Sequence, residues 1–359
     1  MKRNLLNFII SISVILISLS LISCGEKASG EEKKLEHIQK IYNKKGIKEF
    51  IKKVKKEHYF PVKDFEKDEA TPLLIAVESM DFETAKFFLD KGASVDEKDM
   101  HGRDLIDYAL KTNDVKTIDF VINVMPSGYW NLEESDGLIP IIKFIKNCND
   151  YNCIKEVYDL TERKDFTDVN GKTLLMYAAQ CNINVQIVKL LLDNGSDIDI
   201  KNNNEWTALM YAARYNPNPA VLEDLILRGA NTQPNSVGLT VTMLASCNKN
   251  PGVLFTLLQY KNEINCSTDQ GKTALMYACE NKQDSTVIKM LIDNGADLNA
   301  KDSSGKTVRE YLTANSSLST SDIAIAWKSA EDTVITDSAE TKIAEIELPE
   351  EFIGDNNQE

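Results

Sequence analysis

A phosphate-binding loop is the first chemistry that the sequence suggests. Gly-Lys-Thr occurs three times, ending at Thr173, Thr273 and Thr307. Such a loop cradles phosphate with backbone N–H groups. Its full pattern also requires a glycine five residues before the glycine of the tripeptide. The residues at those positions are Phe166, Cys266 and Ala300. The tripeptides therefore do not predict a nucleotide-binding site.

Other catalytic groups are sparse. The chain has three histidines, His37, His58 and His101, and no His-Glu-x-x-His pair that could hold zinc. It has no Gly-x-Ser-x-Gly, and no serine or cysteine has a nearby histidine that could activate it. A site made of carboxylates alone stays open, because 55 residues are Asp or Glu, but no particular pair stands out. We expect no catalysis, no cofactor and no metal.

The charge narrows the range of partners. With 41 basic and 55 acidic residues the chain carries a net charge of −14, so it would be repelled by nucleic acid. Hydrophobic residues make up 43% of the chain, which is the composition of a globular protein. Acidic residues gather at the C-terminal end, where residues 330–359 hold ten of them and one lysine. This acidic tail would favour a basic protein partner.

The first 24 residues have the three regions of a secretory signal: two basic residues, an apolar run at 5–22 and a small-residue exit. The run ends in Leu21-Ile22-Ser23-Cys24, which resembles the lipobox of bacterial lipoproteins. The resemblance implies that Cys24 carries a diacylglyceryl thioether, that cleavage precedes it, and that acyl chains hold the mature protein on a membrane. An uncleaved transmembrane helix is the alternative, because 18 residues can just span a bilayer. Both interpretations predict an exported protein of the bacterial cell envelope, either periplasmic or surface-exposed.

One unit recurs along the middle of the chain. Its clearest copies read Gly-Lys-Thr-Leu-Leu-Met-Tyr-Ala-Ala at 171–179 and Trp-Thr-Ala-Leu-Met-Tyr-Ala-Ala at 206–213. The anchor residues lie 33 to 35 apart, at positions 71, 104, 139, 173, 207, 240, 273 and 307. This period and this residue pattern resemble the ankyrin repeat over residues 68 to 312. The resemblance implies an all-α solenoid of about seven copies and a partial eighth.

The residues themselves agree with a helix–turn–helix unit that has a projecting loop. In the copy that begins at Thr173, Ala178 and Ala179 would let the same helix of the next copy approach closely. An apolar stripe at 187–192 has the spacing of a second helix, and Gly195 follows it where the chain would turn left-handed. A single unit cannot bury its apolar face alone, so stacking is obligatory.

Some copies depart from the pattern. Phe144 takes a small-residue position in the third copy, and Asp104 and Ile139 replace the anchor threonine. These departures leave regular stacking open between residues 113 and 168. The histidine that ankyrin repeats often carry after the threonine is replaced by Met176, Met210, Met243 and Met276. Methionine at this helical spacing favours core packing, and an adaptable binding groove is the alternative.

Four segments are predicted from these patterns. They are a signal peptide at 1–23, a tether with a helical N-terminal cap at 24–67, the repeats at 68–329 and an acidic tail at 330–359. A cap is expected because a stack needs a polar outer face at each end, and residues 321–329 would close the other end with a last helix. The tail is expected to be flexible, or to dock through a short segment at 343–353.

Six cysteines remain after Cys24. Three of them occupy helix positions that favour small packing residues: Cys181, Cys247 and Cys279. Cys148 and Cys153 are close together in a predicted loop, and in an exported protein such a pair could form a disulfide.

The family resemblance also implies a binding surface. In ankyrin repeats the partner contacts the concave face, made of the loop tips and the ends of the inner helices. Carried over position by position, this face comprises Met100, His101, Arg103, Asn170, Lys172, Gln180, Asn203, Asn204, Trp206, Arg214, Tyr215, Ser236, Val237, Leu239, Asn248, Asp269, Gln270, Lys272, Glu280 and Asn281. Trp206, Arg214 and Tyr215 belong to one copy and are types that dominate interface energies. Trp206 could equally pack against the adjacent loop.

The sequence therefore predicts a membrane-anchored binding module, without catalysis, that mediates protein–protein interaction in the bacterial cell envelope. Two alternatives stay open. One is an enzyme inhibitor or a hydrolase in the irregular section at 113–168, and the other is a purely structural envelope lipoprotein.

Overall fold

The structure is a computed structural model that describes residues 71–90, 92–99, 101–134, 136–260, 263–281, 285–315, 317–318 and 321. The predicted signal peptide, the tether with its cap and the acidic tail lie outside the described residues, as does all of the predicted closing helix except Ser321. The chain forms two compact units, unit 1 at residues 1–129 and unit 2 at residues 130–359.

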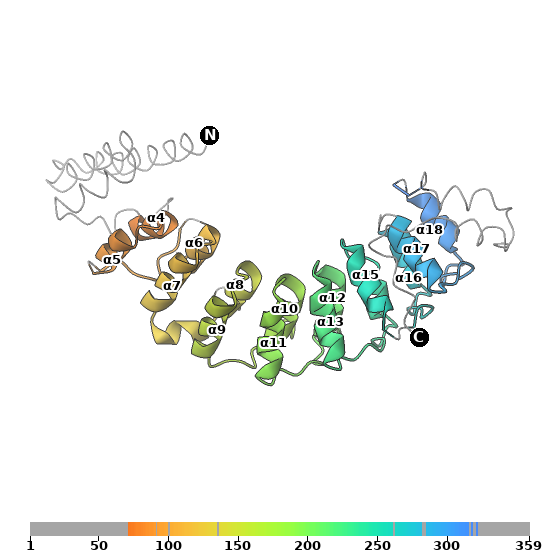
Figure 1. Cartoon of the computed structure of the whole chain (residues 1–359), viewed down its shortest axis with the longest axis horizontal. Helices are drawn as coiled ribbons and strands as arrows, with labels where there is room; N and C mark the ends of the chain where they lie inside the picture. Colours follow the sequence, from red (N-terminus) through yellow and green to blue (C-terminus); the bar gives the residue numbers. More distant parts are fainter. Residues whose placement is uncertain are drawn as a thin grey trace, which may run out of the picture. The chain divides into compact units, whose positions relative to one another are not determined.

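The described residues of both units form pairs of short α-helices (Figure 1). Unit 1 contains α4 (Pro72–Glu78), α5 (Phe82–Asp90), α6 (Leu105–Thr112) and α7 (Val115–Val124), and the 3₁₀ turn η1 (Ser127–Asn131) joins the two units. Unit 2 contains α8 (Pro140–Asn147), α9 (Tyr151–Leu160), α10 (Leu174–Cys181), α11 (Val185–Asp193), α12 (Ala208–Tyr215), α13 (Pro219–Leu227), α14 (Val241–Ala245), α15 (Pro251–Leu258), α16 (Ala274–Glu280), α17 (Ser285–Asp293) and α18 (Val308–Ala314). The predicted all-α fold of repeated helix pairs is confirmed.

The first helix of each pair, called the inner helix here, begins at the anchor residue of its repeat. Thr173 Oγ1 accepts the N–H of Met176 at 3.2 Å, and the same cap recurs at Thr207, Thr240 and Thr273. Where the threonine is replaced, Asp104 caps α6 with its carboxylate, whereas Ile139 makes no side-chain cap and α8 begins with a proline instead. The 33-residue period therefore fixes where the inner helices begin.

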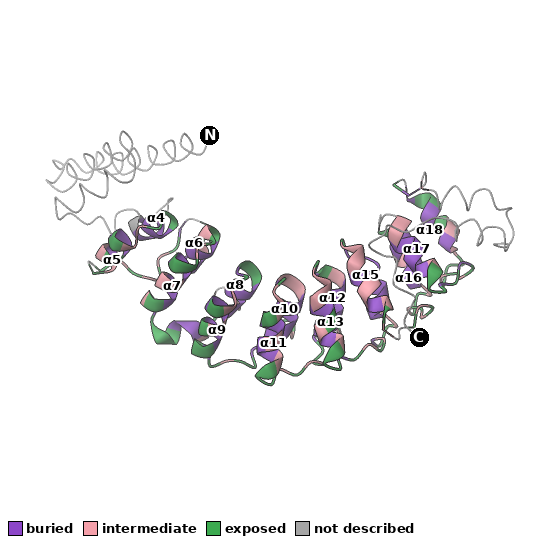
Figure 2. Ribbon diagram, viewed as in Figure 1, coloured by how far each residue is buried: buried purple, intermediate pink, exposed green. Residues whose placement is uncertain are grey.

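Unit 2 has two layers of helices. The inner helices α8, α10, α12, α14, α16 and α18 contact one another in chain order, and the outer helices α9, α11, α13, α15 and α17 do the same. Buried faces lie between neighbouring helices (Figure 2). Ala178 and Ala212 are fully buried, as expected where inner helices approach closely. The methionines at 176, 210, 243 and 276 are also buried, at 0 to 3% exposure, so they fill the core and form no open groove.

The third repeat departs from the others, as its sequence predicts. Phe144 is buried, and its ring meets Trp130 edge-on with 6.0 Å between the ring centres. Trp130 comes from η1, which replaces the turn that begins with Gly92, Gly195, Gly229 or Gly295 in other repeats. A large aromatic pair thus packs at the beginning of unit 2, where regular repeats use alanine. The division between the two units falls directly before Trp130, inside the irregular section.

A row of buried asparagine amides joins successive repeats of unit 2. Asn216 is fully buried, and its amide donates to the carbonyl oxygens of Ala179 at 2.9 Å and Asn182 at 2.8 Å, both in the preceding repeat. Asn182 and Asn248 make the same two bonds one repeat before and one repeat after. The side-chain oxygen of each asparagine accepts the N–H two residues later. These three residues, the asparagine ladder, are thus satisfied across each repeat boundary.

A second row of asparagines runs beside the ladder. Asn184, Asn218 and Asn250 cap the outer helices and donate to a carbonyl of the preceding repeat. The sequence Asn-x-Asn at these three inner-to-outer turns supplies both rows. The next repeat interrupts the ladder, because Asn281 is exposed and donates to Tyr277 of its own helix.

Neighbouring loops approach so closely that one position requires glycine. Gly271 has a φ of +72°, and a Cβ atom there would lie 2.8 Å from the backbone nitrogen of Ser303 in the next loop. Ser303 donates that N–H to the carbonyl of Gln270 at 2.9 Å. Glu205 takes the same position in its own repeat, with a φ of +60°. There the carboxylate of Glu205 accepts the N–H of Ser236 at 2.9 Å and joins the two loops.

Removing an amide of the ladder should destabilise the stack. We expect Asn216→Ala to lower the free energy of unfolding by about 2–4 kcal/mol, because two carbonyls and one N–H lose their partner inside the protein. Asn281→Ala is the matched control, and its exposed side chain should cost less than about 0.5 kcal/mol. Urea denaturation followed by circular dichroism measures both. Equal losses for the two variants would contradict a role of the ladder in stability.

Two glycine substitutions separate backbone strain from loop contact. Gly295 has a φ of +83° but open space around its missing Cβ, so Gly295→Ala should cost about 1–2 kcal/mol from strain alone. Gly271→Ala adds a collision with the next loop and should cost about 1–3 kcal/mol more. The same denaturation experiment measures the difference, and equal costs would show that the loops do not need this close approach.

Candidate functional site

Four repeats carry a basic loop residue five positions before an inner-helix tyrosine, and in three of them the tyrosine hydroxyl donates to a loop aspartate. In the fourth repeat these are Asp168, Tyr177 and Lys172. The hydroxyl of Tyr177 donates to Asp168 Oδ2 at 2.8 Å, and Asp168 Oδ1 accepts the N–H of Asn170 and of Lys172, each at 2.8 Å. Burial and the bond to Asp168 raise the pKa of Tyr177, so its hydroxyl keeps the proton that it donates. This group of three fixes the loop to the helix.

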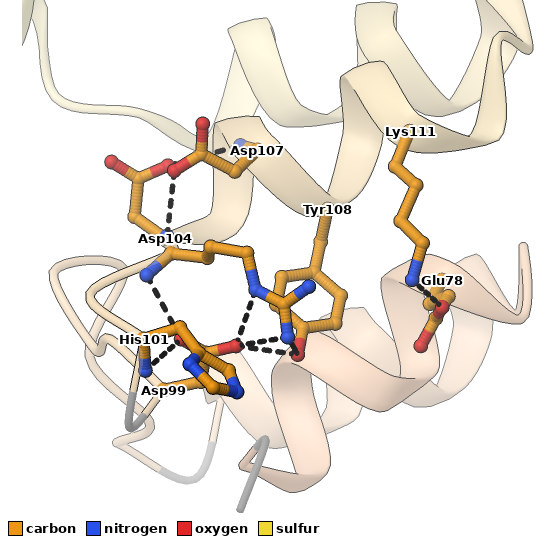
Figure 3. A network of polar contacts seen from close by, with 8 residues as sticks. Glu78, Asp99, His101, Asp104, Asp107, Tyr108 and Lys111 are labelled. Carbon is orange, nitrogen blue, oxygen red and sulfur yellow. Dashed lines mark hydrogen bonds and ion pairs between the residues drawn. The ribbon is translucent and has the colours of Figure 1, made fainter.

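Unit 1 contains the same arrangement (Figure 3). The hydroxyl of Tyr108 donates to Asp99 Oδ2 at 3.0 Å, and Arg103 Nε donates to the same oxygen at 2.7 Å. Burial raises the pKa of Asp99, but the bonds from Arg103, Tyr108 and the loop outweigh it and hold the pKa below its ordinary value. Figure 3 also shows Lys111 of α6 reaching Glu78 of α4, with 2.7 Å between nitrogen and oxygen. Arg103 therefore has a structural partner within its own loop.

Lys172 lies between the tyrosine rings of two successive repeats. Its Nζ atom is 4.0 Å from the ring centre of Tyr177 and 4.4 Å from that of Tyr211 in the next repeat. It also donates to the side-chain oxygen of Gln180. Each cation–π contact contributes about 0.5–2 kcal/mol, more where water is excluded. Lys172 is only 8% exposed, and burial lowers its pKa.

Lys272 repeats this placement further along the stack. Its Nζ atom lies 5.7 Å from the ring centre of Tyr277 and 5.3 Å from that of Tyr311. Burial disfavours its charge, but an ion pair with Glu280 at 2.7 Å outweighs this and raises the pKa of Lys272. Lysine–tyrosine contacts therefore link repeats along the loop side of the inner helices.

The pattern changes in two neighbouring repeats. Trp206 and Leu239 stand where the other copies mostly carry a basic residue. The Trp206 ring lies 5.2 Å from that of Tyr211 and stacks on that of Tyr215 at 6.0 Å between ring centres. Tyr215 is 49% exposed at the end of α12. Aromatic side chains thus replace a charged one at this point of the surface.

Two further contacts shape this region. Arg214 lies over the ring of Tyr215, with 5.3 Å to the ring centre, and donates to the carbonyl of Cys247 at 2.6 Å. Val237 is 49% exposed in the loop that Glu205 joins to the loop of Trp206. We call Trp206, Tyr211, Tyr215, Val237 and Leu239 the aromatic window.

The structure leaves most of the predicted surface residues accessible. The exposed ones are His101, Arg103, Asn170, Asn203, Asn204, Tyr215, Ser236, Val237, Asp269, Gln270, Glu280 and Asn281. Half-buried are Gln180, Trp206, Arg214, Leu239 and Lys272. Met100 lies outside the described residues.

The prediction of an accessible side chain is wrong for two residues. Asn248 is 1% exposed because its amide belongs to the asparagine ladder. Lys172 is buried because two tyrosine rings enclose its ammonium group.

Apart from Tyr215, the sequence analysis did not identify the inner-helix tyrosines as part of this surface. Tyr211 contacts both Lys172 and Trp206 and so connects the lysine–tyrosine row with the aromatic window. A signal was present in the sequence, because a tyrosine follows the basic residue by five positions in four copies, at 108, 177, 277 and 311.

The disulfide that the sequence allows between Cys148 and Cys153 is not formed in the structure. Cys148 and Cys153 are buried, free thiols; the Cys148 thiol donates to the carbonyl of Asp150 at 4.0 Å, and burial raises the pKa of Cys148. No three His, Cys, Asp or Glu side chains of the described residues gather as ligands for a metal ion. Within the same ranges, no helix has the length and apolar character needed to cross a membrane.

Comparison with models of known protein families identifies the type of these repeats. A model of three ankyrin repeats matches residues 141–235 and 213–302, and a model of a single ankyrin repeat matches residues 68–100. No curated protein matches the chain. The matched segments cover more than half of the 359 residues. Ankyrin repeats generally act as protein–protein interaction modules and are typically not catalytic. With its period, its capped helix pairs and these matches, the chain belongs to the ankyrin-repeat family.

Proposed function

We propose that this protein is a membrane-anchored, non-catalytic module that binds a protein partner in the bacterial cell envelope, and that the aromatic window is its contact surface. Membership of the ankyrin-repeat family supports a protein partner. The observation that carries the choice of surface is the change of pattern at Trp206 and Leu239. The lysine–tyrosine row satisfies its own charges, whereas the window leaves aromatic and aliphatic surface exposed.

The window has the composition of an interface centre. Tryptophan, tyrosine and arginine contribute most to binding energies, and Trp206, Tyr215 and Arg214 meet at the end of one inner helix. Trp206 packs against two tyrosines and keeps part of its surface accessible, so packing and binding are compatible roles for it. Because these rings hold one another in place, little conformational freedom is lost on binding.

The N-terminal sequence supports the anchor and the location. The lipobox residues and the apolar run before them favour lipid attachment at Cys24. Two or three acyl chains would keep the protein on a membrane permanently, with palmitate among the expected acyl groups. The acidic tail at 330–359 favours a basic partner for that end of the chain.

A photo-crosslinking amino acid tests the surface in intact cells. With the crosslinker at Tyr215, we expect a discrete adduct with one partner protein, and Trp206→Ala should reduce its yield by about tenfold or more because a central anchor is lost. The matched control places the crosslinker at Leu227, which is 70% exposed on the outer helix of the same repeat. Equal adducts from both positions, or an adduct unaffected by Trp206→Ala, would contradict the assignment, provided that circular dichroism shows intact helices.

Metabolic labelling tests the anchor. Wild-type protein should incorporate labelled palmitate, and Cys24→Ser should lose the label and keep its signal peptide, because only the thiol can form the thioether. Cys181→Ser is the control and should be labelled normally. A wild-type chain that takes no label and retains residues 1–23 would favour the transmembrane-helix alternative.

A further inference from the structure

We propose that a cavity between the loops that precede α14 and α16 is a second binding site, and that its ligand carries a primary ammonium group. The cavity has a volume of about 420 Å³, and its lining residues come from these two loops and from the beginning of α14. Pockets for small ligands have volumes of about 300–1,000 Å³. None of the lining residues belongs to the aromatic window, so this inference stands apart from the proposed function of the window.

An unusual residue in the core opens the cavity. The second residue of the inner helix is a buried leucine in three other repeats of unit 2, at Leu175, Leu209 and Leu275. In α14 the same position is occupied by Thr242, which lines the cavity. The shorter side chain of threonine leaves space that leucine fills elsewhere, and it brings a polar atom into a layer that is otherwise apolar.

The hydroxyl of Thr242 has no partner within the protein. Thr242 is 2% exposed, and its side chain forms no hydrogen bond within the part of the chain that the structure describes. The hydroxyl is not sealed inside the protein but opens onto the cavity. A polar group in the interior normally has a hydrogen-bond partner, so we expect a polar group to occupy this space.

The charge of the walls selects the kind of polar group. No lysine, arginine or histidine is among the described residues that line the cavity, and the one charged side chain is the exposed Glu263. Among these residues Glu263 is bonded only to Cys266, whose thiol donates to its Oε2 atom at 2.9 Å. This bond and burial raise the pKa of Cys266 to about 11, so the thiol stays protonated and neutral. The carboxylate therefore has no cationic partner there, and the cavity favours a cation over an anion.

An ammonium group matches the walls by its hydrogen bonds as well as by its charge. It has three donors and no acceptor. The cavity offers oxygen acceptors on the carboxylate of Glu263, the hydroxyls of Thr232 and Thr242, and the side-chain amide of Gln233. The hydroxyl and amide side chains of these three residues have no other partner among the residues that the structure describes. The ammonium can belong to a free amine or to a lysine side chain of a polypeptide.

Methyl NMR of the full, lipidated chain in detergent tests the proposal. With threonine methyl groups labelled, butylammonium should shift the signals of Thr232 and Thr242, with a dissociation constant on the order of 1 mM for so small a ligand. The signals of Thr207 and Thr307, which begin other inner helices, should not move. Nα-acetyl-lysine methylamide carries the same group on a backbone. If it binds as tightly as butylammonium or more tightly, the cavity takes a lysine side chain, and if it binds more weakly, the cavity takes a free amine.

Three variants locate the site and its charge. Thr242→Leu restores the leucine of the other repeats and should abolish the shift of Thr232, because the new side chain fills the cavity. Glu263→Gln should weaken the binding of butylammonium by about tenfold or more, because it removes the charge that the ligand neutralises. Asp269→Asn is the matched control, since Asp269 is an exposed carboxylate of the same loop that does not line the cavity. Its effect on binding should be less than about twofold. Circular dichroism should show intact helices in all three variants.

Three outcomes would overturn the proposal. Equal shifts with the neutral Nα,Nε-diacetyl-lysine methylamide would show that the cavity does not recognise the positive charge. Tighter binding of butyrate or of glucose would assign the cavity to an anion or to a polyol. Signals of Thr232 and Thr242 that do not move at concentrations well above the expected constant, or a shift of Thr232 that persists in Thr242→Leu, would show that no amine enters the cavity.

Discussion

A buried asparagine that donates both amide hydrogens into the preceding repeat is the interaction on which the rest of unit 2 depends. An ankyrin repeat cannot bury its apolar face alone, so every repeat must dock against its neighbours. Apolar contact between alanine and methionine surfaces is non-directional and would tolerate sliding. Asn182, Asn216 and Asn248 remove that freedom, because a shifted neighbour would leave buried carbonyls and amides without partners.

The register set at this end of the helices also places the loops at the other end. Asp168 and Tyr177 tie a loop to its helix, and Lys172 then lies between two rings that only correct stacking brings together. Within this stack, Trp206 and Leu239 take the position of the basic loop residue in two successive repeats. This replacement is enough to interrupt the lysine–tyrosine row with an exposed aromatic surface. The window is therefore rigid because the repeats around it are regular, and a rigid surface loses little entropy on binding.

Much of this fold could be predicted from the sequence, because periodic features carry physical meaning. The threonine anchors, the alanine positions and the glycine turns recur with the repeat, and each corresponds to a cap, a close contact or a left-handed residue. The asparagine ladder could not be predicted, since asparagine near a helix end is usually exposed or a simple cap. The family resemblance places Asn248 on the concave face by its position at the end of an inner helix, whereas its amide is buried in the ladder. The resemblance places Lys172 on that face too, whereas its charge is enclosed by a tyrosine of the next repeat that a single copy does not reveal. Nor does the sequence of η1 indicate that the chain divides into two units there.

Native-state hydrogen exchange in unit 2 tests the central claim that the asparagine ladder couples the repeats. The ladder connects α8, α10, α12 and α14 and is interrupted at Asn281, between α14 and α16; Asn315 then makes one bond of the same kind from the end of α18 to Cys279 of α16. We predict that amides of α8, α10, α12 and α14 exchange through one shared opening, whose free energy exceeds that of α16 and α18 by about 1 kcal/mol or more. A boundary between α10 and α12, or a single opening free energy for all six inner helices, would contradict the account.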